Sequence, residues 1–562
     1  MSLMVLSSAY AENEFQRLRQ QAFKAATPEQ HVLLYRQCLA AWQESEGLSE
    51  RQSVAKSLAY WLDMMTWKTL AIKQNKAETL AILPIIKPWL EEAIQVAPDY
   101  APVYRSLGYA YYKAAMYEQA IPIFRKGLDL PEIAADVLRF WWTSLKDLGR
   151  TGEMLAYLEP ITASNPDYNR VYYLSKTYQL LNRIPEATGL IKVFLADRKK
   201  LTENELWLYS QLLLLLDMQG EWKQAMAAGQ EYLARGGDPK LWDFVSYYVQ
   251  VAKQYGQEQF GLGNYDQAEF AYQQALEYMA LAPSLREQDE IQREPISARL
   301  AQVRERRDLG QIKPRQTYRI LALTITRIDA SYTNLSGQPV RYQNPALDPL
   351  SLKWRTLAQN HLARSIETWS HGNMTVVFEE QTIDATITDF HLNWFGNDPK
   401  SNNEMRTAKL ESIKPSIMEL LLTRCNEFDS LLVYYNGANG VGGGLHGRSM
   451  RFEYQPGLVS KAWRGTLDIP LNFIARYEGP SILVHEFFHN IESICGIKVQ
   501  HGYLAANRNA FPSWKGEGEI DYYRWHFDHT LATKGGEHIN FRKTWPETLN
   551  LTLPTRVHDG AP

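Results

Sequence analysis

The chain is poor in cysteine, with only Cys38, Cys425 and Cys495 among its 562 residues. Three cysteines so far apart in the sequence form neither a disulfide framework nor a Cys-x-x-Cys zinc site. Cys495 follows the histidine motif described below, and we expect it to be a buried apolar thiol and not a nucleophile. The fold must therefore be held together by apolar cores.

Long apolar runs and a strong charge of one sign are also missing. No stretch has the length of a transmembrane helix, so we expect no membrane span. The formal net charge is −3, which gives no electrostatic footprint for nucleic acid. Apolar residues make up 45% of the chain and charged residues 22%, which is typical of globular proteins, and the length suffices for several domains.

The first eleven residues end in Ala9-Tyr10-Ala11, which is similar to a signal-peptidase site. They carry no basic segment and only a short apolar one. Two interpretations stand side by side: residues 1–11 are the remnant of a longer signal peptide, as in a secreted or periplasmic protein, or they are a frayed N-terminus. The compartment stays unknown at this stage.

Residues 12–311 predict helix after helix, with a recurring pattern of small and large residues. Pro98 and Pro166 each open a Pro-Asp-Tyr turn, and they stand 68 residues apart, which is twice a 34-residue period. This region resembles the tetratricopeptide repeat family, best over 98–131 and 255–280 and less closely elsewhere. The residues that carry the resemblance in the first of these stretches are Tyr104, Leu107, Gly108, Tyr111, Ala120, Phe124 and Gly127.

The resemblance implies an all-α solenoid whose inner face binds a peptide or protein partner. Many aromatic side chains could line that groove, although for any single one we favour packing between helices. Residues 284–309 are rich in charge, and we expect a solvated terminal or connecting helix there. The aromatic side chains in question are Trp141, Trp142, Tyr172, Tyr173, Trp207, Tyr209, Trp242, Tyr247 and Tyr248.

Composition changes near residue 312, where strand patterns begin to alternate with helical ones. Residues 318–326, 373–380 and 429–435 predict strands, and 351–370 predict a helix. Residues 466–473 predict a further strand, which could form the sheet edge that aligns an extended substrate. We therefore expect a second, α+β domain over 312–562.

The stretch that organises this second domain is Ser481–Gly496, which predicts one helix containing His-Glu-x-x-His. His485 and His489 are four residues apart, so they share a helix face and can bind one ion. Glu486 points to one side, where it can hold a water molecule. Apolar residues surround the motif, so the helix is expected to be buried, and buried histidines need polar partners or a metal. We predict a zinc (Zn²⁺) site with Glu486 as general base.

The third ligand must come from elsewhere, because Glu492 lies about 10.5 Å along the helix axis from His485. The motif Trp514-Lys-Gly-Glu517-Gly resembles the second helix of the gluzincin metallopeptidases, a group of zincins, which supplies a glutamate ligand. The resemblance implies Glu517 as the third ligand. The interval from His489 to Glu517 is longer than is commonest in that group, so Glu519, Asp521 and His501 stay open.

The whole pattern predicts a zinc-dependent peptidase whose helical repeats recruit substrate or a partner protein. Two alternatives remain: a non-catalytic scaffold with a structural or relic zinc site, and a zinc hydrolase of non-peptide amides. The donor that stabilises the developing oxyanion is undecided. Its candidates are Tyr522, Tyr523, His526 and His529.

Overall fold

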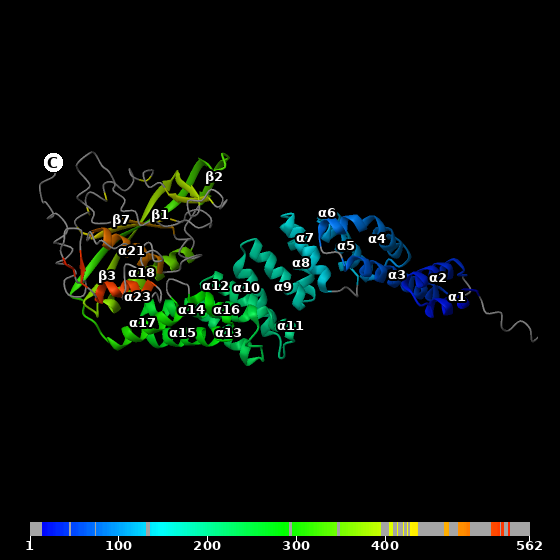
Figure 1. Cartoon of the computed structure of the whole chain (residues 1–562), viewed down its shortest axis with the longest axis horizontal. Coiled ribbons are helices and arrows are strands. Elements are labelled where there is room, and N and C mark those ends of the chain that lie inside the picture. Colours follow the sequence, from blue (N-terminus) through cyan, green and yellow to red (C-terminus); the bar gives the residue numbers. More distant parts are fainter. Residues whose placement is uncertain are drawn as a thin grey trace, which may run out of the picture. The chain divides into compact units, whose positions relative to one another are not determined.

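The computed structural model describes most of the chain up to residue 394 and separate segments beyond it (Figure 1). The chain divides into two compact units, Met1–Leu208 and Tyr209–Pro562, called here the N-terminal and C-terminal units. Residues 1–11 lie outside the described residues. The described residues are 14–43, 47–72, 75–130, 135–290, 295–344, 349–394, 404–408, 413, 420, 424, 427–435, 466–470, 481–494, 519–528, 530–532 and 538–539.

Within its described residues, the N-terminal unit is built from helices. From α1 to α10 each helix contacts the next, and α3, α5, α7 and α9 also contact one another in turn, as expected for stacked helical pairs. At the second of the two predicted Pro-Asp-Tyr turns, Asp167 caps α9 by accepting a hydrogen bond of 3.0 Å from the backbone N–H of Arg170. The helices are α1 (Glu14–Phe23), α2 (Pro28–Ala40), α3 (Leu48–Leu70), α4 (Lys76–Val96), α5 (Ala101–Lys113), α6 (Tyr117–Leu128), α7 (Ala135–Asp147), α8 (Thr151–Ser164), α9 (Tyr168–Leu180), α10 (Ile184–Ala196) and α11 (Glu203–Leu206).

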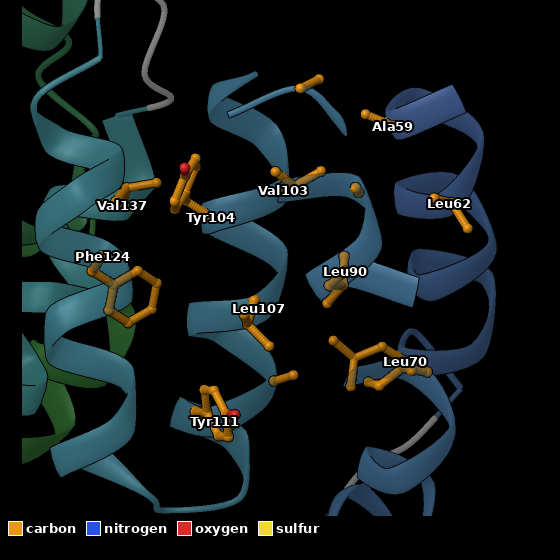
Figure 2. Close-up of a cluster of buried hydrophobic side chains, with 14 of the residues drawn as sticks. Ala59, Leu62, Leu70, Leu90, Val103, Tyr104, Leu107, Tyr111, Phe124 and Val137 are labelled. Carbon is orange, nitrogen blue, oxygen red and sulfur yellow. The ribbon is translucent and has the colours of Figure 1, made fainter. Parts of the chain in front are cut away.

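The core of this unit follows the tetratricopeptide-like pattern. Figure 2 shows Tyr104, Leu107 and Tyr111 spaced along α5, with Phe124 of α6 on the neighbouring helix. All four are buried. A Cβ atom added to Gly108 would lie 2.3 Å from Phe124 Cε1, so only glycine allows α5 and α6 to approach this closely. The predicted signature residues therefore do the packing that the repeat requires.

The C-terminal unit begins with further helices. The charged stretch 284–309 was expected to be a solvated helix, and this expectation is wrong. It contains two helices, and Arg299, Gln302 and Arg306 are buried on the second. These helices are α12 (Leu208–Met218, which begins at the boundary), α13 (Trp222–Ala234), α14 (Trp242–Leu262), α15 (Tyr265–Met279), α16 (Pro283–Glu290) and α17 (Ile296–Asp308).

A sheet follows in the same unit, close to the predicted strands. β1 (Gln316–Thr333) pairs in parallel with β3 (Met374–Ile387) and β6 (Ser430–Tyr435), and antiparallel with β2 (Pro339–Asn344). β7 (Thr466–Pro470) pairs in parallel with β6 and ends the described sheet order, so the predicted strand is present, and its role as an edge stays a prediction. The short strands β4 (Phe390–Trp394) and β5 (Glu404–Ala408), and β8 (Leu531–Ala532) and β9 (His538–Ile539), form separate pairs.

Side chains alternate across this sheet because successive residues of a strand point to opposite faces. Leu321, Leu323 and Val433 join one apolar cluster. Residues between them face the other way, where Thr324 accepts a 2.6 Å hydrogen bond from Arg355 of helix α18 (Pro349–Trp369). α18 also contacts β3, helix α21 (Ser481–Ile494) and helix α23 (Glu519–Asp528). α18 is therefore the element on which the motif helix packs.

Among the residues that the structure describes, no helix combines the length and the apolar character needed to span a bilayer. The domain boundary expected near residue 312 stays a prediction about composition. In the structure, the helices from α12 to α17 belong to the same compact unit as the sheet.

Candidate functional site

The predicted motif helix is present as α21, which begins at Ser481 as expected and ends at Ile494. Leu483, Val484, Phe487 and Phe488 are fully buried on it. Phe487 meets the ring of Tyr318 on β1 edge to face at 5.3 Å between centroids. The apolar residues around the motif thus fix α21 in the core, as the sequence predicted.

His485 is held inside this core by a partner from the second helix. Its side chain is 6% exposed, and its Nδ1 lies 3.2 Å from the hydroxyl of Tyr523 on α23. This contact orients the imidazole ring, and when Nδ1–H donates to the hydroxyl oxygen of Tyr523, Nε2 carries the lone pair that can bind a metal. Tyr523 is itself fully buried and stacks on Phe488 at 4.6 Å, so its position is fixed by packing.

Glu486 is the next residue along the helix, and its side chain is 1% exposed. Successive residues of a helix point about 100° apart, given 3.6 residues per turn, so Glu486 and His485 face different directions. Burying a carboxylate is unfavourable unless polar groups surround it. A carboxylate in this position, one residue from a buried histidine, is suited to accept a proton inside a site that excludes bulk water.

The other predicted site residues stand as follows. His489 lies on α21 one turn beyond His485, and its side chain is outside the described residues, as are Glu517 and His501. Glu519 and Asp521 lie in the first turn of α23, again with undescribed side chains. Among the described residues, no group of three His, Cys, Asp or Glu side chains is placed to hold an ion. The identity of the third ligand stays a prediction.

Of the four predicted oxyanion donors, the structure describes two side chains. Tyr523 contacts His485, and His526 is fully buried with its ring 5.0 Å from that of Phe488. The side chains of Tyr522 and His529 lie outside the described residues. We expected a second helix from Trp514 to Leu531. The structure describes α23 from Glu519 to Asp528 and places Leu531 in β8, whereas residues 514–518 lie outside the described residues.

Sequence reasoning missed that Tyr523 is the partner of His485. Tyr523 was predicted to lie on the helical stripe with Ile520 and Phe527, and a tyrosine on a buried stripe must hydrogen-bond its hydroxyl. Its predicted role was oxyanion stabilisation, whereas the structure places its hydroxyl against a histidine ring nitrogen. That buried hydroxyl was the signal that could have found the pair.

A second site of interest is the helix pair α14–α15, where α18 lies across the repeat. A Cβ added to Gly256 would lie 2.8 Å from Tyr272 Cε1, so Gly256 and Tyr272 match Gly108 and Phe124. Counted from these glycines, Tyr109, Tyr112 and Lys113 of α5 correspond to Gln257, Phe260 and Gly261 of α14. The first three are half-buried, whereas the second three are buried.

α18 is what buries them. Phe260 packs on His361 at 5.8 Å, and Arg364 Nε donates to the carbonyl oxygen of Gly261 at 3.4 Å. Lys353 pairs with Glu258 at 2.7 Å. The exposed face of this repeat is therefore occupied by a helix of the same chain, and a partner has to bind elsewhere.

Four of the nine aromatic residues proposed for the groove are buried between helices. Trp141, Trp142, Tyr209 and Tyr248 are buried, whereas Trp207 and Trp242 are exposed. The remaining three, Tyr172, Tyr173 and Tyr247, are half-buried.

Comparisons with known proteins agree with the repeat geometry. A family model of the tetratricopeptide repeat matches residues 254–278, which span the end of α14 and most of α15. No curated protein matches the chain. The C-terminal sheet region has no counterpart in the family match.

Solved structures of low similarity also align with parts of the chain. A mutant of MamA is 23% identical, covers 32% of this chain and 92% of its own, and has a TM-score of 0.19. PilW, described as a widely conserved type IV pilus biogenesis factor, is 15% identical over 39% of this chain and 91% of its own, with a TM-score of 0.27. The APC/C hetero-tetramer Cut9–Hcn1 is 13% identical over 53% and 57%, with a TM-score of 0.26. Likenesses at these TM-scores identify neither a function nor a partner.

Proposed function

We propose that the chain is a zinc-dependent peptidase whose helical repeats recruit substrate or a partner protein. One observation carries the proposal: the buried His485 has its Nδ1 against Tyr523, next to the buried Glu486 on a helix that also bears His489. A structural core would gain nothing from burying a carboxylate and an imidazole side by side. A metal hydrolase needs both.

The residues suit a zinc ion. When the Nδ1–H of His485 donates to Tyr523, Nε2 carries the lone pair for coordination, and imidazole is a preferred zinc ligand. His489 and Glu517 would complete a set of three protein ligands, which is typical of catalytic zinc with one open position. A bound zinc ion lowers the pKa of a water molecule and polarises a substrate carbonyl.

The chain's own residues perform the remaining steps. Glu486 accepts the proton of the attacking water and delivers it to the leaving amine. Tyr523 holds the ring of His485 in one orientation throughout. β7, at the edge of the described sheet and in contact with α21, is suited to align an extended peptide by main-chain hydrogen bonds.

The test combines metal content with hydrolysis of a fluorogenic peptide library. Purified protein should contain about one zinc per chain, and His485→Ala should lose it. Glu486→Gln should keep the metal and lose at least 100-fold in turnover, in line with the contribution of a general base. Glu427→Gln, an exposed glutamate of the same unit, is the matched control and should leave turnover unchanged. Full activity of Glu486→Gln would contradict the mechanism.

A non-catalytic protein-binding scaffold is the second candidate, and the tetratricopeptide match at 254–278 favours it. In that case the metal would be structural and closed by four protein ligands. Zinc without hydrolysis of any library peptide, together with a fourth protein ligand, would support the scaffold. Hydrolysis confined to non-peptide amides would keep the mechanism and change only the substrate.

A further inference from the structure

The N-terminal unit presents one continuous helix face, called here the odd-helix face because α3, α5, α7 and α9 contact one another along it. Arg105, Arg139 and Tyr173 follow one another at intervals of 34 residues on α5, α7 and α9, at equivalent positions of successive repeats. None of these side chains is buried. Within the described residues of the N-terminal unit, this face keeps exposed or half-buried side chains and is the counterpart of the face that α18 covers on α14.

Aromatic rings cross this face from helix to helix. Trp67 of α3 stacks on Tyr109 of α5 at 5.4 Å between centroids, and Tyr109 meets Phe140 of α7 at 4.8 Å. Farther along, Trp142 of α7 meets Tyr173 of α9 at 5.6 Å. Such rings provide a rigid surface that loses little entropy when a ligand binds.

Cationic side chains lie over these rings. Arg105 lies over Trp67 at 4.9 Å, and Lys113 over Tyr109 at 5.7 Å. A guanidinium over a ring is held in place while its charge still faces outward. The same arrangement recurs at Arg139 over Phe140 (4.6 Å), Lys146 over Trp142 (6.0 Å) and Lys176 over Tyr172 (5.6 Å).

Basic groups outnumber acidic ones here. Asp136 pairs with Arg105 at 2.7 Å, and Asp147 lies near Tyr112. No carboxylate of the described residues pairs with Arg139 or Lys146, and both side chains are exposed. A chain whose net charge is −3 thus gathers five cations on one aromatic face.

We propose that the odd-helix face binds an acidic segment of a partner protein that also carries apolar side chains. Carboxylates of that segment would meet Arg139, Lys146 and their neighbours, and its apolar side chains would pack on the rings between them. α18 occupies the equivalent face of α14 with both apolar and charged contacts, so a peptide segment fits such a face. The inference rests on the proposed recruiting role of the repeats and names the partner's chemistry.

The probe is a fluorescein-labelled peptide of twelve residues that alternates Glu or Asp with Leu or Phe. Fluorescence anisotropy is measured on the full chain carrying Glu486→Gln, so that hydrolysis does not interfere. The acidic peptide should bind at least 10-fold tighter than its Gln/Asn counterpart, and its affinity should fall as salt is raised. Equal affinity for the two peptides would overturn the proposal.

Arg139→Glu with Lys146→Glu should weaken binding of the acidic peptide at least 10-fold. Lys126→Glu with Lys192→Glu reverses two exposed lysines on α6 and α10 and is the matched control, which should keep the affinity. An equal loss in both double variants would show non-specific charge attraction and would overturn the site. A single-stranded oligonucleotide that binds more tightly than the peptide would assign the face to nucleic acid instead.

These results separate the inference from the peptidase proposal. Hydrolysis of small library peptides without binding of the acidic peptide would overturn only the inference about the odd-helix face and would leave the peptidase proposal standing. Binding at this face by a chain that hydrolyses nothing would support the inference and favour the scaffold.

Discussion

Asp63 is a carboxylic acid inside the N-terminal unit, on α3, with a side chain that is 7% exposed. Burial raises its pKa to about 6, and Ser106 and Arg105 counteract this only in part. The folded state therefore holds the proton more tightly than the unfolded chain does. Stability contributed by the protonated form is present at pH 4 and is lost as the pH rises through about 6.

We predict that Asp63→Asn removes this pH dependence. Raising the pKa from its ordinary value to about 6 corresponds to about 3 kcal/mol, so the variant should be more stable than the natural chain at pH 8 and similar to it at about pH 3.5, below the ordinary pKa of an aspartate. Hydrogen exchange of peptides from α3 and α5 in the full chain measures the difference. Asp197→Asn replaces an exposed carboxylate of the same unit and is the control. It should leave the stability unchanged at both pH values. If the difference in stability between Asp63→Asn and the natural chain were the same at both pH values, the raised pKa of Asp63 would be refuted.

Tyr523→Phe tests the hydrogen bond at His485. Because the phenylalanine ring keeps the stacking on Phe488, only the hydroxyl is lost. We expect zinc affinity to fall about 10- to 100-fold, which is the usual effect of losing a ligand's outer partner. Competition with a fluorescent chelator measures it. Trp525→Phe, on the same helix, is the control. Unchanged affinity would show that Tyr523 does not orient the ligand.

At this scale the sequence predicted the burial of the motif and not its partners. Spacing of four residues and apolar neighbours were enough to predict that His485 would face inward. Its contact with Tyr523 joins residues 38 positions apart, and the buried pair Arg306–Glu367 joins residues 61 apart. A local sequence pattern carries no information about contacts between residues so far apart in the chain. The charged residues in 284–309 were therefore predicted to be exposed to solvent.

Single glycines set the spacing between helices within a repeat. Gly108→Ala would force a Cβ atom into the ring of Phe124, and overpacking of a core typically costs about 1–3 kcal/mol. Gly189 of α10 has open space around its Cα, so Gly189→Ala should stabilise its helix by up to about 1 kcal/mol. We therefore predict that hydrogen exchange becomes faster in α5 and α6 of Gly108→Ala and slower in α10 of Gly189→Ala. Destabilisation of equal size at both positions would contradict the repeat packing.

Elements with a strong period were predictable, and their ends less so. β1, α18, β6 and α21 appear where apolar runs and helical spacing placed them. The second helix of the site was expected to continue to Leu531, because aromatic residues kept the helical register, yet α23 ends at Asp528 and Leu531 belongs to β8. The occupation of α14 by α18 could not be foreseen, since it depends on Gly261 and Asn360 meeting across the unit.

In the C-terminal unit, one buried carboxylate joins the helical part to the sheet. Glu367 of α18 accepts hydrogen bonds from Arg306 of α17 at 3.2 Å, from Arg364 at 2.7 Å and from Thr375 of β3 at 2.9 Å. Arg524 of α23 pairs with Glu305 of α17 at 2.5 Å. α17 is thus tied both to the helix beneath the motif and to the helix that bears Tyr523.

We predict that Glu367→Gln destabilises α17, α18 and α21 together, by about 3 kcal/mol, because the buried guanidinium of Arg306 would lose its counter-charge. Asp384→Asn, which removes an exposed partner of Arg327, should change stability by less than about 1 kcal/mol. Hydrogen exchange resolves the elements one by one. If protection fell in α17 alone, the repeats and the sheet would be separate folding units and the boundary near 312 would hold. A joint loss would mean that the helices after residue 209 are part of the scaffold of the candidate site.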